Sequence, residues 1–410
     1  MQDKTNRPHP FGSGFGLYIH YPFCQSKCPY CDFNVHIDPD RHESQFANSL
    51  IAEMGGLAKH TNTQSRTLRS IFFGGGTPSL MPPESAQRII TAARNIFGLD
   101  PDCEITLEVN PTHAEAAKLQ DFCSIGINRL SLGVQSLKPQ TLAVLGRQHT
   151  PKECLHAIQC AQKACANVSA DFICATPNQT ADAWREELAE ILALNLAHLS
   201  LYQLTIETGT AFYRQVQNGT LTPCNDEIAS DIFTISQNMC STAGLEGYEI
   251  SNYGRTTSVC RHNLLYWQSG DWLGIGPGAV GKFWHNSQHQ NKQQNKRIEY
   301  RTPRNPKTWQ ETVAQNNFNA YDWHEASPAV YGKEALMMGL RLATGVPLGR
   351  IAERAGDKAK WLDEEAVMRL IDQGLMAEKK GWLAITQKGR VVSNAILREI
   401  LPEILPSLEK

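Results

Sequence analysis

The feature that most constrains this 410-residue chain is an alternation of short apolar runs with amphipathic stretches, from residue 16 to about 205. The stretches between the runs, for example 43–57 and 83–97, place apolar residues at i, i+3 and i+4, as in helices lying on a core. Such alternation predicts parallel strands joined by right-handed helical crossovers. The strands are expected at residues 17–21, 70–74, 104–109, 129–134, 168–174 and 198–204. Six units predict an α/β fold with a partial (β/α)6 barrel, whose ligands collect at the carboxyl ends of the strands.

The rest of the chain does not continue this strand–helix alternation. We expect a tail at 1–15, a barrel at 16–245, an α+β connecting region at 246–326 and a C-terminal domain at 327–410. In the last segment, helical patterns are followed by two short strand-like runs, which predicts a winged-helix-like module. Because none of its helices is basic, we interpret it as a packing or partner-binding domain without affinity for nucleic acid.

Composition narrows the class of protein further. The formal net charge is −2, and no apolar run approaches the roughly 20 residues that span a bilayer. The first ten residues are polar and do not resemble a signal peptide, so we expect a cytoplasmic protein. Of the twelve cysteines, nine are dispersed, and we interpret most of these as packing residues.

The other three cysteines lie close together in a loop directly after the first predicted strand. Cys24, Cys28 and Cys31 have C-x3-C-x2-C spacing. A four-iron cluster takes four thiolates, so three local cysteines predict a cluster with one iron left open. Half of a zinc site or a set of redox thiols are the alternatives on spacing alone.

Several polar or glycine-rich signals fall where the next strands end. Residues 74–76 are three consecutive glycines, which let a backbone approach a ligand closely. Glu108 lies in an otherwise apolar strand, where a carboxylate is costly unless it is paired. Gln135 ends the fourth strand, Arg147 offers a fork-shaped cation for a carboxylate, and Asp171 suits hydroxyl groups. Together they predict a ligand pocket at one rim of the barrel.

These motifs also carry a family resemblance. The cysteine loop, Phe-Gly-Gly-Gly-Thr-Pro-Ser at 73–79, Leu-Glu-Val-Asn-Pro at 107–111 and Gly-Val-Gln-Ser at 133–136 together resemble the radical SAM superfamily. More narrowly, the chain resembles the branch containing the oxygen-independent coproporphyrinogen III dehydrogenases (HemN) and the heme chaperones (HemW), from about residue 16 to its end.

The resemblance implies a 4Fe-4S cluster on Cys24, Cys28 and Cys31, with S-adenosylmethionine (SAM) on the open iron. The implied SAM residues are Tyr18, Tyr30 (through its backbone), Gly75, Gly76, Thr77, Glu108, Gln135, Arg147 and Asp171. One departure is that the family usually follows the last acid with Gly-Leu-Pro, whereas residues 175–177 are Ala-Thr-Pro. This departure leaves Asp171 itself intact but changes the residues of the turn that follows it.

A histidine lies among aromatic residues beyond the barrel. Considered alone, His262 fits either a structural role or a contact to a flat ligand such as heme, including axial ligation of its iron. The run resembles the HNxxYW motif of the heme chaperones, which implies that His262, Asn263, Tyr266 and Trp267 handle heme.

The very polar stretch at 284–297 contains His285 and His289. These histidines raise the possibility of a metal site. We favour an exposed loop or hairpin tip, because polar, low-complexity segments commonly form such structures.

Three functions compete at this point: a heme chaperone, a porphyrin-biosynthetic dehydrogenase, and a radical SAM enzyme with another substrate. The dehydrogenases carry a fourth cysteine two positions after the third, where this chain has Phe33. They also have a longer extension before the first cysteine. We therefore expect a heme chaperone, with the cluster and SAM gating heme release, and leave open whether any radical reaction occurs.

The resemblance implies a heme-accepting apoprotein as partner, with respiratory enzymes as the expected class. No nucleic-acid partner is expected. Contact with a membrane surface and a homodimer are both compatible with the sequence.

Overall fold

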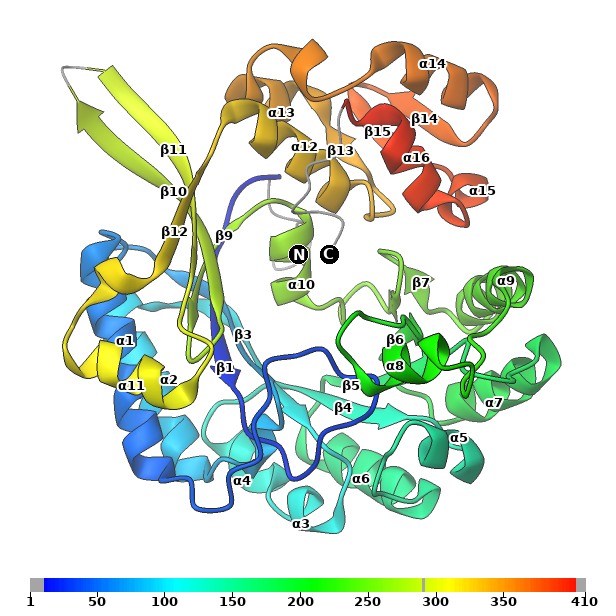
Figure 1. Cartoon of the computed structure of the whole chain (residues 1–410), viewed down its shortest axis with the longest axis horizontal. Helices are drawn as coiled ribbons and strands as arrows, with labels where there is room; N and C mark the ends of the chain where they lie inside the picture. Colours follow the sequence, from blue (N-terminus) through cyan, green and yellow to red (C-terminus); the bar gives the residue numbers. More distant parts are fainter. Residues whose placement is uncertain (1–10, 290–291, 403–410) are drawn as a thin grey trace, which may run out of the picture.

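The computed structural model describes residues 11–289 and 292–402, and its central feature is one curved sheet (Figure 1). Six consecutive strands are parallel, each paired with the next along the chain. They are β1 (Phe15–Tyr21), β2 (Leu68–Gly75), β3 (Leu99–Val109), β4 (Arg129–Gln135), β5 (Val168–Cys174) and β6 (His198–Gln203). The six predicted strands and their parallel pairing are confirmed.

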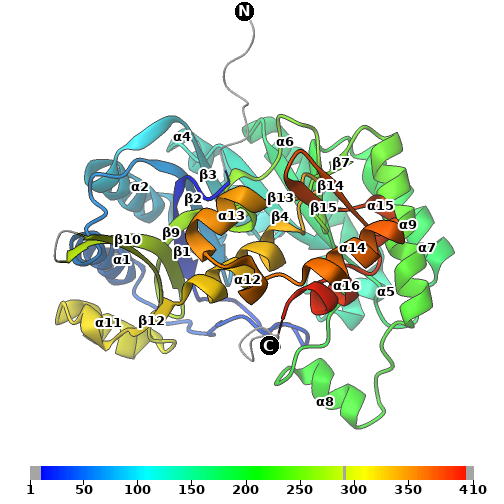
Figure 2. The same cartoon turned by 90° about the horizontal axis from the view of Figure 1, so that it is seen from above.

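Helices cover the outer side of these strands, except α8 (Ala211–Gln217), which lies beside the cysteine loop, where the Phe212 amide donates to the Pro29 carbonyl over 3.0 Å (Figures 1 and 2). Local signals set their ends: Gly98, with φ of 75°, terminates α2, and a capping box formed by Thr150 and Glu153 begins α6. The elements are α1 (Glu43–His60), the 3-10 turn η2 (Pro78–Leu80), α2 (Pro83–Phe97), α3 (His113–Ala116), α4 (Leu119–Ser124), α5 (Pro139–Val144), α6 (Pro151–Ala164), α7 (Ala181–Ala193), α8 (Ala211–Gln217) and α9 (Asp226–Thr242).

The strands bury apolar side chains outward, against the helices, and keep polar ones in the barrel lumen. Leu17, Ile19 and Ile71 belong to the main core and are fully buried. Side chains on the opposite face contact each other in the lumen, for example Ser131 of β4 with Asp171 of the adjacent β5. This alternation follows from the two-residue repeat of a strand, and it lines the lumen with polar groups.

The segment 246–326, predicted as a connecting region, adds strands to both edges of the same sheet. Strand β8 pairs antiparallel with β6 at one edge, and β9 pairs parallel with β1 at the other. The elements are β7 (Glu246–Gly247), β8 (Asn252–Gly254), α10 (Arg261–Trp267), β9 (Asp271–Ile275), β10 (Val280–His289), β11 (Lys292–Arg301), α11 (Pro306–Ala314), η3 (Phe318–Ala320) and β12 (Asp322–Ala326).

The polar stretch at 284–297 forms the outer part of the β10–β11 hairpin, which projects from the body of the protein (Figure 1). The hairpin interpretation is confirmed. Residues 290–291 lie outside the described part of the chain. Among the described residues, no three His, Cys, Asp or Glu side chains are grouped closely enough to hold one metal ion.

The C-terminal segment has a core of its own and a small three-stranded antiparallel sheet. Its order of helix, strand, two helices and hairpin is that of a winged helix. The elements are α12 (Pro328–Gly339), β13 (Val346–Pro347), α13 (Leu348–Ala355), η4 (Lys358–Lys360), α14 (Glu364–Asp372), β14 (Met376–Lys379), β15 (Trp382–Ile385), α15 (Gln387–Arg390) and α16 (Ser393–Ile400).

The C-terminal domain and α10 lie on one side of the barrel, and the cysteine loop lies on the other (Figure 1). The Ala343 amide donates to the Tyr248 carbonyl over 2.9 Å, and the Arg341 guanidinium lies 5.5 Å from the Trp267 ring centre. The carboxyl ends of the six parallel strands therefore stay uncovered by the C-terminal domain.

Within the described residues, no helix has the length and apolar character needed to cross a membrane.

Candidate functional site

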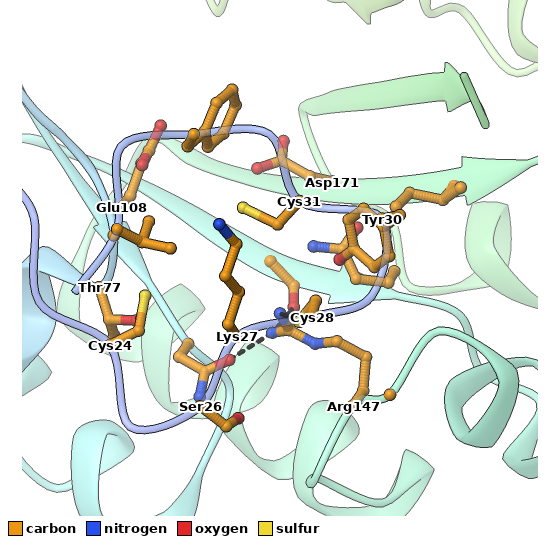
Figure 3. Close-up of a pocket in the computed structure, with 18 of the residues that line it drawn as sticks. Cys24, Ser26, Lys27, Cys28, Tyr30, Cys31, Thr77, Glu108, Arg147 and Asp171 are labelled. Atoms are coloured by element: carbon orange, nitrogen blue, oxygen red, sulfur yellow. Dashed lines mark hydrogen bonds between the residues drawn. The ribbon is translucent and has the colours of Figure 1, made fainter. Parts of the chain in front are cut away.

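The cysteine loop leaves the carboxyl end of β1 and is closed by its own backbone. The Cys24 amide donates to the His36 carbonyl over 3.0 Å, and the Cys31 amide donates to the Cys28 carbonyl over 3.1 Å. All three thiols line one cavity of about 440 Å³ (Figure 3). Burial raises the pKa of Cys24 and of Cys31, so a positive centre is needed to keep them as thiolates.

The glycine run at the end of β2, residues 74–76, holds this loop in place through backbone hydrogen bonds. The Gly76 amide donates to the Tyr21 carbonyl over 2.7 Å, and the Thr77 amide donates to the Phe23 carbonyl over 2.9 Å. A Cβ at Gly76 would lie 2.7 Å from the Phe23 carbonyl oxygen, so only glycine fits without movement. The Thr77 hydroxyl also donates to Cys24 Sγ over 3.5 Å, which joins the two segments at the site.

Arg147 brings a cation to the same cavity. Its guanidinium donates to Cys28 Sγ over 3.5 Å, to the Gly133 carbonyl over 3.0 Å and to the Asn110 side chain. Its Nε is buried without a hydrogen-bond partner. A buried unpaired donor is costly, and an incoming carboxylate would satisfy it.

Two carboxyl groups lie on the lumen side of the cavity. Glu108 accepts a hydrogen bond from the Gly75 amide over 3.1 Å, and burial together with nearby Asp171 raises its pKa to about 8. Burial also raises the pKa of Asp171, which accepts from the Ser131 hydroxyl over 3.2 Å. Raised pKa values keep such groups ready to share a proton with hydroxyl or ammonium groups of a ligand.

The fourth strand ends in an irregular turn that aims a side chain at the cavity. Gln135 has φ of 69°, and the pairing of β4 with β5 shifts register between Gly133 and Gln135. Both residues line the cavity. Ala175, in the turn that departs from the family pattern, also has positive φ, 53°, which L-residues rarely adopt.

The donor set fits a cluster with a zwitterionic ligand better than it fits a single metal ion. No three metal-binding side chains converge within the described ranges, which disfavours zinc for these cysteines. A cluster instead takes each thiolate on a separate iron, so sulfurs spread around one cavity suit it. The unpaired Arg147 Nε and the two acids then match a carboxylate and hydroxyl groups.

Most of the predicted SAM residues line this cavity together, but Tyr18 does not. Its hydroxyl bonds to His20 Nδ1 over 3.0 Å, and its ring stacks on Phe72 in the lumen. Tyr18 lies three residues before the end of β1, and its contact with SAM stays a prediction. The residues that line the cavity are Cys24, Cys28, Tyr30, Cys31, Gly75, Gly76, Thr77, Glu108, Gln135, Arg147 and Asp171.

The His262 motif lies at the opposite end of the barrel. His262 Nδ1 bonds to the Ser70 hydroxyl over 2.8 Å, near the start of β2, and its backbone N–H donates to Glu104 over 3.1 Å. Gly75, at the cavity, is five residues farther along β2, about 16 Å at the rise of a strand. The structure therefore separates the two predicted sites.

His262 is also enclosed by its neighbours. It is 1% exposed, its Nε2 bonds to the Tyr266 hydroxyl over 2.7 Å, and its ring stacks on Phe72. Asn263, Tyr266 and Trp267 are half-buried. The heme contact of this motif stays a prediction, and it requires α10 to move because both ring nitrogens of His262 are already bonded.

Sequence reasoning missed several residues that line the cavity: Lys27, Phe33, Asn110, Ser131, Tyr202 and Leu204. In the sequence analysis, Phe33 was used only to distinguish the heme chaperones from the dehydrogenases. Asn110 and Tyr202 could have been found, because each lies at the carboxyl end of a predicted parallel strand, where ligands bind.

Family models match two parts of the chain. The radical SAM superfamily model matches residues 18–192, and the HemN C-terminal domain model matches residues 326–392.

Curated relatives extend this similarity over almost the whole length. The mouse mitochondrial radical S-adenosyl methionine domain-containing protein 1 is 33% identical over 401 residues, which are 97% of this chain and 89% of the relative. The heme chaperone HemW of Mycobacterium tuberculosis is 31% identical over 402 residues, 95% of each chain. HemW of Escherichia coli is 37% identical over 270 residues, 65% of this chain and 69% of the relative.

Among solved structures, coproporphyrinogen III oxidase (HemN) of Escherichia coli, a radical SAM enzyme, has a TM-score of 0.77. It covers 96% of this chain and 91% of its own, at 19% sequence identity. At that identity the likeness establishes the fold alone.

Proposed function

Because this chain belongs to the radical SAM superfamily, in the branch of HemW and HemN, we propose that it is a heme chaperone. In this proposal it binds a 4Fe-4S cluster, SAM and heme, and it transfers heme to an acceptor protein. Respiratory enzymes are the class of acceptor that we propose.

The observation that carries the proposal is Phe33. The resemblance to the dehydrogenases implies a fourth cysteine at this position, two residues after Cys31. Here the position holds an apolar ring that is 60% exposed and lines the cavity. An exposed phenyl ring cannot ligate a metal, but it can contact an apolar ligand. The relatives named heme chaperones support the same choice.

Different residues at the rim would bind the cluster and SAM. The three loop cysteines would hold the cluster, and the Arg147 guanidinium, Glu108, Gln135 and Asp171 would orient SAM. When bound, a reduced cluster with SAM supplies one-electron chemistry, while the protein orients and shields the reacting groups. The partly enclosed cavity limits the access of water to them.

Two assays on one preparation test the proposal. The chain is reconstituted anaerobically with iron, sulfide and SAM, loaded with hemin, and mixed with the apo form of a b-type cytochrome. We expect the heme spectrum to move to the cytochrome and the holo-cytochrome to form faster than with free hemin.

In parallel, the same preparation receives coproporphyrinogen III, SAM and a reductant. We expect no decarboxylated product. Turnover of coproporphyrinogen III would make the dehydrogenase the better proposal, and a complete lack of heme transfer would contradict the chaperone.

A further inference from the structure

The cavity has an apolar wall that neither the cluster nor SAM requires. Ile173 in β5 and Tyr202 in β6 are directly paired neighbours on adjacent strands, and both line the cavity. Leu204 continues this wall and packs with Ile173 in one apolar cluster that also contacts Tyr30. Tyr202 is 41% exposed although it lies inside the barrel mouth. Apolar surface left open beside a polar cofactor site indicates a second ligand.

Phe33 extends that apolar surface from the cysteine loop. The loop exposes two large apolar side chains, Phe33 at 60% and Ile37 at 61%. Only Phe33 lines the cavity. The loop around it is held by backbone bonds, including the Val35 amide to the Phe33 carbonyl over 2.9 Å, so the ring is presented by an ordered turn.

A cation lies on the same rim. Lys27 is exposed, lines the cavity and extends among the labelled site residues in Figure 3. In the described part of the chain it is in no ion pair. Asp32 and Glu207 line the cavity as well, so the carboxylates of a ligand would be directed toward Lys27 and away from these acids.

The size of the cavity decides where such a ligand can lie. About 440 Å³ suits one ligand of ordinary drug size, so a cluster with SAM would occupy the interior. A further ligand, if broad and planar, would therefore have to lie across the mouth, where Phe33, Tyr202 and Lys27 line the cavity. A flat apolar ring with carboxylates at its edge combines the requirements of the aromatic side chains and of the cation.

We propose that heme lies across the mouth of this cavity, with its ring against Phe33 and Tyr202 and a propionate paired with Lys27. This inference rests on the proposed function and assigns the heme position within it. It also assigns His262 a structural role, since that side chain is buried, doubly hydrogen-bonded and at the other end of the barrel.

The test is a hemin titration of the full-length protein after anaerobic reconstitution with cluster and SAM, followed by heme absorbance. Iron and sulfide are quantified first for every variant. We expect Phe33→Ala to weaken hemin binding about tenfold and Phe33→Trp to retain it, because the ring face supplies the contact. Lys27→Glu should weaken binding at least about threefold, with a smaller loss at high salt.

Matched controls come from the same surface types. Ile37→Ala removes an equally exposed apolar side chain from the same loop but outside the cavity, and should bind hemin as the wild type does. Lys379→Glu reverses an exposed charge in the C-terminal domain and should be equally silent. His262→Gln keeps a hydrogen-bonding side chain at this position in α10 but removes the imidazole. This variant should retain the wild-type affinity and heme spectrum.

Each outcome separates the inference from its premise. If the wild type does not bind hemin, the proposed function fails. If it binds hemin and Phe33→Ala binds equally well, or if His262→Gln loses the heme, the assigned position is wrong. A Phe33→Ala protein with normal hemin affinity but slow transfer to the acceptor would make this surface a protein contact and overturn the assignment.

Discussion

A buried acid far from the candidate site makes the stability of this protein depend on pH. Glu53, in α1, is fully buried and accepts hydrogen bonds from the Tyr321 hydroxyl over 2.5 Å and from the Gly276 amide over 2.7 Å. It therefore joins α1 to the turn after β9 and to the segment before β12. Burial raises its pKa from 4.5 to about 7, even though both hydrogen bonds favour the charged form.

The direction of the effect follows from proton linkage. The folded state holds the proton of Glu53 up to about pH 7, whereas the unfolded chain releases it near pH 4.5. Between these values the folded state binds more protons, so the stability contributed by this group falls as pH rises and is lowest above pH 7. The difference between the two pKa values corresponds to a loss of up to about 3 kcal/mol.

Glu53→Gln tests this reasoning, because the amide can accept from the Gly276 N–H and donate to the Tyr321 oxygen without a charge. We expect the variant to be more stable than the wild type at about pH 8, by up to about 3 kcal/mol, and to lose that advantage near about pH 5. Urea unfolding followed by circular dichroism at several pH values measures the difference.

Tyr321→Phe provides a second check on the same acid. Removing the hydroxyl that favours the charged form should raise the pKa of Glu53 further and shift the pH-dependent loss of stability upward. If the wild type and Glu53→Gln have parallel pH profiles, Glu53 does not titrate in this range and the argument fails.

The remaining predictions concern the cluster and SAM. Serine in place of any one of the three loop cysteines should reduce the bound iron and the visible absorbance of the cluster. Cys154→Ser, in the packed core, should change neither, and iron analysis of the reconstituted proteins measures the difference. Arg147→Lys loses the forked guanidinium and should weaken SAM binding about tenfold in calorimetry, with iron content unchanged. Gly76→Ala forces its new Cβ toward the Phe23 carbonyl, so we expect less iron after reconstitution, and a normal cluster would contradict the close contact.

The parallel core could be predicted because its signals are local. The run at 17–21 became β1 (Phe15–Tyr21), and the strands of the core alternate outward apolar with inward polar residues. The pairing of β9 with β1 could not be predicted in this way, since the two strands are about 250 residues apart. The sequence of a five-residue strand does not specify which other strand it will pair with.

The rim of the candidate site could be predicted for a geometric reason. Residues at the carboxyl ends of neighbouring parallel strands meet at one edge of the sheet, and Glu108 and Gln135 do so here, whereas Asp171 lines the cavity from three residues before the end of β5. Tyr18 lies at the same depth in β1, but its hydroxyl bonds to His20 and it does not line the cavity, so its contact with SAM stays a prediction. Its contact with Phe72 belongs to the packing of the lumen.

The His262 motif illustrates what a local pattern leaves undetermined. A histidine among aromatic residues suits heme, but the same residue types also suit a plug for a polar lumen, where an imidazole can bond on both sides. The choice depends on which end of the strands α10 covers, and only the register of Ser70 and Glu104 against the helix reveals it. Since α10 contacts the C-terminal domain through Trp267 and Arg341, moving it to admit heme would also disturb that domain. A site at Phe33 requires neither movement, which is the physical reason to prefer it.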